Sequence, residues 1–261
     1  MNKKNIIDFT IIILIAPLLM LCIWSFTNSW PFPYMFPKKI SFRGFEYLLI
    51  GENLQVLLIS VTVSIVTTFI TIIISIPAAK AITLYEFKGK KFFELLIISP
   101  IIVPLISIVM GVHITFIKLG LANTMAGVII INILPCIPYA VRIIGDVYKM
   151  VGDKFEMQAK MLGADRYNTF KYVTFPLILP GIIGAASMSF IISFSQYFLV
   201  LIIGGGNIVT YPIVMFPYIQ SGDRTISALY SMVFLIVSII VLILIEWGVK
   251  HRYNREKSFF D

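Results

Sequence analysis

Long runs without a single charged residue constrain this chain more than any other feature. Residues 53–79 carry no charge, and residues 172–222 continue without one for 51 positions. A helix that crosses the hydrocarbon core of a bilayer, roughly 30 Å thick, needs about 20 apolar residues. Charged residues make up only 13% of the chain, about half the share that a soluble domain needs to cover its surface. The composition therefore excludes a water-soluble enzyme domain and a disordered chain.

Six spans fit these apolar runs. The Gly204–Asn207 turn signal divides the longest run, and the prolines and aromatic residues that follow predict an interfacial loop or a short half-buried helix. We therefore expect an all-α integral membrane protein that forms one domain over residues 1–261. The expected spans cover about residues 8–27, 54–80, 95–117, 120–142, 177–203 and 225–247.

Basic residues predict the orientation of these spans. An even number of spans places both termini on one side of the membrane, and fifteen of the 21 Lys and Arg residues fall on that side. Five fall on the other side, and Arg142 lies at a predicted span end. Because Lys and Arg are enriched in cytoplasmic loops, both termini are expected in the cytoplasm. This distribution also explains the net charge of +8 without nucleic acid as a partner.

The sequence lacks the residue patterns of common catalytic and cofactor sites. It has no Gly-rich phosphate loop that ends in Lys-Ser or Lys-Thr, and it offers no nucleophile–base pair or metal-ligand cluster. The two cysteines, Cys22 and Cys136, lie within apolar runs and are expected to be small buried residues. We therefore expect no metal, no cofactor and no enzymatic activity in this chain.

The longest predicted cytoplasmic connection, residues 150–175, has helical character of its own. Asp153 is expected to cap a first helix, with Glu156 three positions later as in a capping box. Gly163 is expected to end that helix in the left-handed conformation, and Asp165 is expected to cap a second short helix. Because a helix of about ten residues is marginal alone, it must pack on its own bundle or dock in a groove of a soluble partner.

Several residues of this connection match a known signature. Ala159, Gly163, Phe170, Val173 and the Phe175-Pro176 pair resemble the EAA loop of ABC-importer permeases. The segment also precedes the penultimate span, as it does in that family. The resemblance covers nearly the whole chain and is closest to the spermidine/putrescine-type branch, whose relatives include iron, thiamine and phosphonate importers.

The resemblance implies that this connection is a coupling helix seated in a cleft of a cytoplasmic ATPase. The chain departs from the family pattern at Met157 and Gln158, where Glu and Ala are favoured, and its acidic residue stands one position earlier, at Glu156. The residues that the resemblance assigns to ATPase coupling are Phe155, Glu156, Ala159, Leu162, Gly163, Ala164 and Phe170.

The resemblance also implies a function and a set of partners. The chain would be a permease subunit of an ATP-driven importer, multi-pass in a bacterial cytoplasmic membrane. It would form part of the path for a small solute, with a polyamine favoured over phosphonate, iron or thiamine. The implied partners are a cytoplasmic ABC ATPase dimer that hydrolyses the ATP, a second permease subunit of a different chain, and an extracytoplasmic solute-binding protein.

Polar residues midway along the fifth predicted span are candidates for lining the translocation path. Polar groups inside a membrane line a path or join helices by hydrogen bonds, and the sequence leaves both roles open. Prolines in the third and fourth spans predict kinks, which could be static or could act as hinges. The candidate path residues are Ser193, Ser195, Gln196 and Tyr197, and the prolines are Pro100, Pro104, Pro135 and Pro138.

An autonomous ion-coupled secondary transporter or channel is the alternative function. In that case the connection at 150–175 would be a surface helix without a partner. No charged residue lies well inside a predicted span, which argues against a proton-coupled transporter. A non-transporting scaffold is a third hypothesis, and dependence of transport on an ATPase separates the first two.

Overall fold

The computed structural model describes residues 3–28, 39–48 and 51–257, and helices make up almost all of them. Residues 29–38 and 49–50 of the predicted loop after the first span lie outside the described part. Within that part, the only strand-like feature is an isolated antiparallel bridge between Thr27 and Ile40. The helices are α1 (Lys3–Ser25), α2 (Arg43–Leu48), α3 (Gly51–Leu84), α4 (Lys90–Ile102), α5 (Leu105–Lys118), α6 (Met125–Val151), α7 (Lys154–Met161), α8 (Arg166–Thr169), the π-helical segment η1 (Phe170–Thr174), α9 (Phe175–Phe194), α10 (Phe198–Gly204), α11 (Tyr211–Ser221) and α12 (Arg224–Lys257).

Four helical segments of the described residues are long and apolar enough to cross a membrane: 51–84, 125–151, 166–194 and 224–248. The pair α4–α5 gives a fifth span if it is counted as one broken span. The described apolar part of α1, Ile11–Ser25, is shorter than a span. The all-α membrane fold is therefore confirmed, whereas the count of six spans stays a prediction.

The span expected over residues 95–117 is interrupted where the sequence predicts a proline kink. The chain forms two helices there, α4 and α5, which meet at an angle of 105°. Val103 is extended, with φ −85° and ψ 129°, because the ring of Pro104 disfavours the helical conformation in the residue before it. By contrast, α6 continues through Pro135 and Pro138 to Val151, nine residues beyond the end predicted at 142.

The fifth span also differs from the prediction over 177–203. Residues 166–194 form one continuous helical segment, which then breaks at Ser195–Tyr197 before α10 begins. The segment after the Gly204–Asn207 turn, predicted as an interfacial loop or a short half-buried helix, forms the helix α11.

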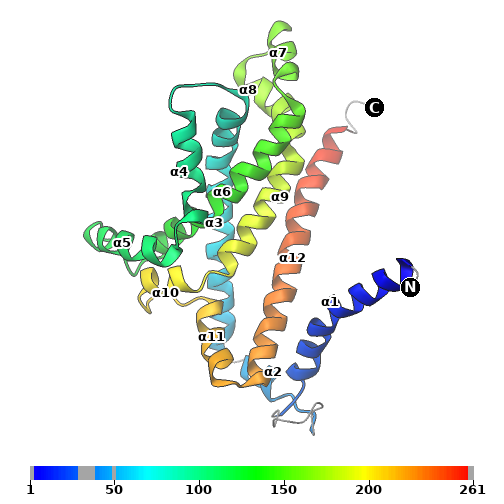
Figure 1. The fold of residues 1–261 in the computed structure, drawn as a ribbon, viewed down its shortest axis with the longest axis vertical. Coiled ribbons are helices and arrows are strands. Elements are labelled where there is room, and N and C mark those ends of the chain that lie inside the picture. The colour runs from blue at the N-terminus through cyan, green and yellow to red at the C-terminus, as the bar shows by residue number, and fades with distance from the viewer. Residues whose placement is uncertain (1–2, 29–38, 49–50, 258–261) are drawn as a thin grey trace. The chain divides into compact units, whose positions relative to one another are not determined.

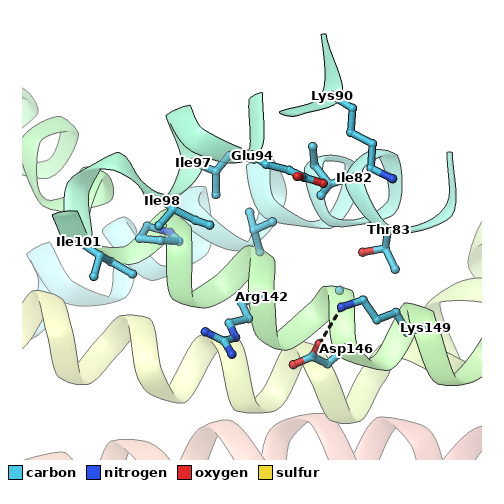
Figure 2. A pocket seen from close by; sticks show the side chains of 13 residues that line it. Ile82, Thr83, Lys90, Glu94, Ile97, Ile98, Ile101, Arg142, Asp146 and Lys149 are labelled. Atoms are coloured by element: carbon cyan, nitrogen blue, oxygen red, sulfur yellow. Dashed lines mark hydrogen bonds and ion pairs between the residues drawn. The ribbon is translucent and has the colours of Figure 1, made fainter. Parts of the chain in front are cut away.

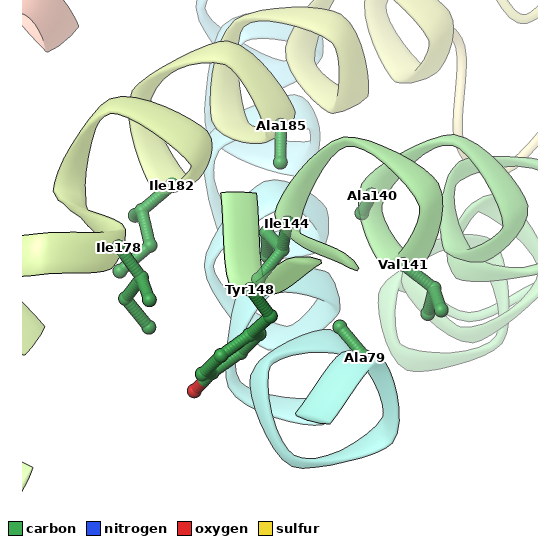
Figure 3. Packing of buried hydrophobic residues seen from close by; sticks show 8 residues of the cluster. All are labelled: Ala79, Ala140, Val141, Ile144, Tyr148, Ile178, Ile182 and Ala185. Atoms are coloured by element: carbon green, nitrogen blue, oxygen red, sulfur yellow. The ribbon is translucent and has the colours of Figure 1, made fainter. Parts of the chain in front are cut away.

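The chain divides into two compact units, one of residues 1–58 and 210–240 and the other of residues 59–209 and 241–261. In the second unit, α6 and α9 run side by side (Figure 1). Small residues allow this close approach: Ala140 and Ala185 are fully buried, and a Cβ added at Gly181 would lie 2.8 Å from the Val147 side chain. Small residues at a helix interface are typical of packing inside membranes. Figure 3 shows Tyr148 and Ile144 of α6 between the α9 residues and Ala79 of α3.

Tyrosines organise the core of the first unit. The Tyr211 hydroxyl donates to the backbone carbonyl of Tyr230 at 3.1 Å, and the Tyr230 hydroxyl donates to the Asn53 side-chain oxygen at 2.8 Å. Tyr211 and Tyr230 are each 1% exposed. These hydrogen bonds offset the loss of hydration that both hydroxyls undergo when they are buried.

Candidate functional site

A helix–turn–helix hairpin, α7–α8, stands at one end of α6 and α9 (Figure 1). Gly163 lies at φ +87°, as the sequence predicts. The Gly163 amide donates to the Lys160 carbonyl and the Ala164 amide donates to the Ala159 carbonyl, both at 3.0 Å. These two bonds form a Schellman motif, which requires the left-handed residue.

Of the two predicted helix caps, the Asp165 cap is present and the Asp153 cap is not. Asp165 accepts a hydrogen bond from the Asn168 amide at 2.9 Å and caps α8, which confirms the prediction. Asp153 makes no side-chain capping bond, so the predicted capping box is wrong. Glu156, the other member of that box, is 7% exposed and bonds elsewhere.

The Glu156 carboxylate joins three segments of the chain. Lys80, near the end of α3, donates to its two oxygens at 2.7 and 2.6 Å, and the Thr174 hydroxyl of η1 donates at 2.7 Å. The acidic contact that the family resemblance places at the ATPase is therefore occupied within this chain. Lys80 and Thr174 lie 76 and 18 positions from Glu156, too far for sequence spacing to predict their contacts.

The environment of Glu156 favours its charged form. Burial by itself raises the pKa of this carboxyl, but the hydrogen bonds from Lys80 and Thr174, helped by the positive charges of Lys80 and Lys160, hold the pKa below its ordinary value. A carboxyl with a depressed pKa stabilises the folded state above its unfolded pKa, and this stabilisation is lost as the pH falls through the folded pKa.

We therefore expect α7 docking to be insensitive to pH over the physiological range. Amide hydrogen exchange of residues 154–161, corrected for the intrinsic rate, should show equal protection between about pH 8 and pH 5.5, both above the ordinary Glu pKa. Protection should fall only in stronger acid. A loss of protection between pH 8 and pH 5.5 would contradict the charged pair.

The outer face of the hairpin exposes large apolar side chains. Leu162 is 88% exposed and Met161 is 79% exposed at the turn. Phe155, Tyr167 and Phe170 are also exposed, whereas Ala159 and Ala164 are half-buried. Clustered exposed apolar groups outside the spans are typical of a protein–protein contact. We call the exposed residues Phe155, Met161, Leu162 and Tyr167 of the hairpin, together with Phe170 at the start of η1, the hairpin face.

A second candidate site lies where two helix breaks meet. A pocket of about 400 Å³ is lined by the α4–α5 break around Val103–Pro104, by Pro135 and Tyr139 of α6, and by Ser195 and Gln196 after α9. Its lining residues carry no charge. Two of the four predicted path residues, Ser195 and Gln196, thus share one pocket with the proline break.

The other two predicted path residues are placed differently. Ser193 is 4% exposed and lies 3.5 Å from the Asn132 side-chain nitrogen, in the α6–α9 interface. Tyr197 precedes α10 and does not line the pocket. Ser193 therefore lies at a helix interface, as the helix-joining alternative expects. Among the residues that the structure describes, no three His, Cys, Asp or Glu side chains lie close enough to share a metal ion.

Comparisons with known proteins show the family to which this chain belongs. Residues 71–251 match the family model described as "Binding-protein-dependent transport system inner membrane component". The chain is 23% identical over 260 residues to the "Probable sulfate transport system permease protein" of Helicosporidium sp. subsp. Simulium jonesii, covering 94% of this chain and 92% of that protein. It is also 23% identical over 254 residues to the putrescine transport system permease protein of Escherichia coli strain K12, covering 94% and 89%.

A solved structure shares the fold. A chain from the crystal structure of a bacterial ABC transporter involved in the import of the acidic polysaccharide alginate superposes with a TM-score of 0.71 at 15% identity, covering 94% of each chain. The family match spans well over half of the chain and includes α7, α8 and all three lining segments of the pocket at the helix breaks. The chain therefore belongs to the binding-protein-dependent transport system inner membrane components, the multi-pass permease subunits of ABC importers, and is a transport component rather than an enzyme.

Proposed function

We propose that this chain forms one side of the translocation path of an ATP-driven importer and receives its ATPase on the hairpin face. The carrying observation is that apolar side chains are exposed on a hairpin that the buried Glu156 ties to two spans. A partner groove that covers Leu162 and Met161 would bury apolar surface at roughly 25 cal/mol per Å². The proposed partners are an ATPase dimer, a second permease subunit and an extracytoplasmic binding protein.

The contacts suggest how motion of the ATPase would reach the path. Glu156 holds α7 to Lys80 on α3 and to Thr174 on η1. The helical segment 166–194 then runs without interruption to the break at Ser195. At 1.5 Å per residue this segment is about 43 Å long. A displacement of the hairpin would therefore be carried to the break that lines the pocket.

The size and neutral lining of the pocket at the helix breaks support the proposal of a small solute. They favour neither a cationic nor an anionic solute. Its lining residues are neutral, and two named relatives transport solutes of opposite charge, sulfate and putrescine. A polyamine preference would call for carboxylates, which the lining lacks. We propose that solute selection lies mainly with the binding protein.

Isolation of the assembled complex tests this proposal. The tagged chain is purified from its native membrane in mild detergent, and co-purifying proteins are identified by mass spectrometry. We expect an ATPase and a second permease. Uptake of the solute taken by the binding protein should then stop with vanadate and persist with an ionophore. Purification of the chain alone, with uptake that follows an ion gradient, would favour the autonomous transporter.

Replacement of Gly163 by valine is expected to uncouple ATP hydrolysis from uptake. A Cβ at this position would meet nothing within 4 Å, so the cost arises from the backbone at φ +87° and amounts to about 1–2 kcal/mol. Gly163→Asn is the control, because Asn tolerates the left-handed conformation. ATP hydrolysed per solute imported should rise severalfold in the Val variant only. An unchanged ratio in Gly163→Val would contradict the role of this turn.

Replacement of Gln196 by leucine is expected to lower uptake without preventing assembly. Gln196 supplies the side-chain amide of the pocket lining. Without this amide, a polar solute that passes the pocket loses one hydrogen-bond partner. Gln220→Leu, the same change at an exposed position on α11, is the control. Loss of the complex in Gln196→Leu, rather than loss of uptake, would assign Gln196 to helix packing.

A further inference from the structure

A larger pocket lies between α4, α6 and the end of α3 (Figure 2), and it adjoins the pocket at the helix breaks through Ile101, which lines both. Its volume is about 500 Å³. One wall comes from α4, where Lys90, Glu94, Ile97, Ile98 and Ile101 recur at helical spacing. The facing wall comes from α6, and Ile82 and Thr83 of α3 complete the lining. The α6 residues are Pro138, Val141, Arg142, Gly145, Asp146 and Lys149.

The pocket is amphipathic along its length. Lys90 and Lys149 lie toward the helix ends that the charge pattern places in the cytoplasm, whereas Ile101 and Pro138 lie further along the spans. Ile98 and Ile101 are 44% and 52% exposed, so the apolar wall is open to the surroundings. In a membrane, an acyl chain of a neighbouring lipid can therefore pack against these isoleucine side chains.

Arg142 is exposed and is the cation of this lining that is free to bind a ligand. It lies nine residues before the end of α6, about 14 Å along the helix from that end. It has no hydrogen-bond or ion-pair partner among the described residues, whereas Lys90 bonds Glu86 at 2.7 Å and Lys149 reaches Asp146 at 3.4 Å. A cation that lines a partly apolar pocket without a partner attracts a counter-charge.

We propose that this pocket binds an anionic phospholipid, with the headgroup phosphodiester on Arg142 and an acyl chain along Ile98 and Ile101. Three cationic and two acidic side chains line it, so its formal charge is +1, which a headgroup of charge −1 neutralises. Basic pockets between helices on the cytoplasmic side are typical of lipid-headgroup sites. The apolar wall favours a lipid over a free oxyanion, because an oxyanion would leave that wall empty. The site rests on the chain being a membrane protein and is independent of ATPase coupling.

Lipid retention by the purified complex tests the site. The complex is delipidated, then incubated with phosphatidylglycerol or phosphatidylcholine, and bound lipid is counted by native mass spectrometry. We expect Arg142→Gln to weaken phosphatidylglycerol binding about tenfold, equivalent to 1.4 kcal/mol, and Arg142→Lys to restore much of it. Ile98→Trp should also weaken binding, since it fills the pocket while keeping every charge. Lys88→Gln, an exposed lysine outside the lining, is the matched control and should change nothing.

Three results would overturn the proposal. One is equal phosphatidylglycerol binding by the unaltered chain and Arg142→Gln. Another is an equal loss in Lys88→Gln, which would indicate general surface charge. The third is displacement of the lipid by millimolar inorganic phosphate together with unchanged binding in Ile98→Trp, which would assign the pocket to a free oxyanion. The experiment counts bound lipid and does not measure uptake or ATP hydrolysis. Its result is therefore the same whether or not the hairpin face binds an ATPase.

Discussion

Removal of the Glu156 carboxylate in Glu156→Ala is expected to release α7 from the bundle. The Lys80 ammonium, whose side chain is only 25% exposed, would lose both of its short contacts. Deleting one partner of a buried pair costs about 3–5 kcal/mol, and we expect the lower end because Lys80 retains some solvent. Hydrogen exchange of residues 154–161 should accelerate by about two orders of magnitude, since 1.4 kcal/mol corresponds to tenfold. ATP hydrolysis should no longer drive uptake.

Two further variants separate the buried pair from surface charge. Glu86→Ala removes the exposed partner of Lys90, and surface pairs contribute only about 0–1 kcal/mol. Lys80→Met combined with Glu156→Leu replaces both charges by apolar groups, which is often neutral or stabilising, so it should restore protection of α7. If hydrogen exchange of residues 154–161 is as slow in Glu156→Ala as in Glu86→Ala, the bonds of Glu156 to Lys80 and Thr174 do not hold α7 in place.

Leu162→Asp is expected to abolish ATPase binding while leaving the chain folded. Leu162 is 88% exposed, so its loss should change the stability of this chain by no more than about 0.5 kcal/mol. In a partner groove, however, the new carboxylate would be buried without a counter-charge. We expect the affinity for the ATPase to fall at least about a hundredfold, or 2.8 kcal/mol, measured by co-purification and by titration of the purified ATPase.

Leu119→Asp provides the control for this substitution. Leu119 is 65% exposed at the end of α5, where the charge pattern predicts the extracytoplasmic side. It should leave ATPase binding unchanged. Equal binding by Leu162→Asp and the unaltered chain would remove the hairpin turn from the interface.

Local rules explain which features the sequence could predict. The left-handed Gly163 and the Asp165 cap depend on a few neighbouring residues, and both are as expected. The break before Pro104 also has a local cause, but its size does not: proline predicts a kink, and only the packing around α4 and α5 gives the 105° bend. Pro135 and Pro138, with the same chemistry, leave α6 continuous.

Long-range contacts explain what the sequence could not predict. The sequence predicts that Glu156 caps a helix or binds a partner. In the structure it bonds Lys80, which lies 76 positions away. Arg142 is predicted at a span end, and only the packing of α4 beside α6 shows that it lines a pocket with Ile98 and Ile101. Ser193 and Gln196 lie three positions apart on one polar stretch, yet one faces Asn132 and the other lines the pocket. In each case the side chain's role depends on which helix packs against it.

Site-specific photo-crosslinking from position 162 tests most directly whether the hairpin face couples this chain to an ATPase. A photoreactive residue replaces Leu162 in the native host, and a second strain carries it at position 119, which is also exposed, as the reference. Crosslinked products are identified by mass spectrometry. We predict an ATP-binding protein crosslinked from position 162 and none from position 119. Crosslinks from 162 only to this chain or to lipid, in cells that import the solute, would contradict ATPase coupling through this face.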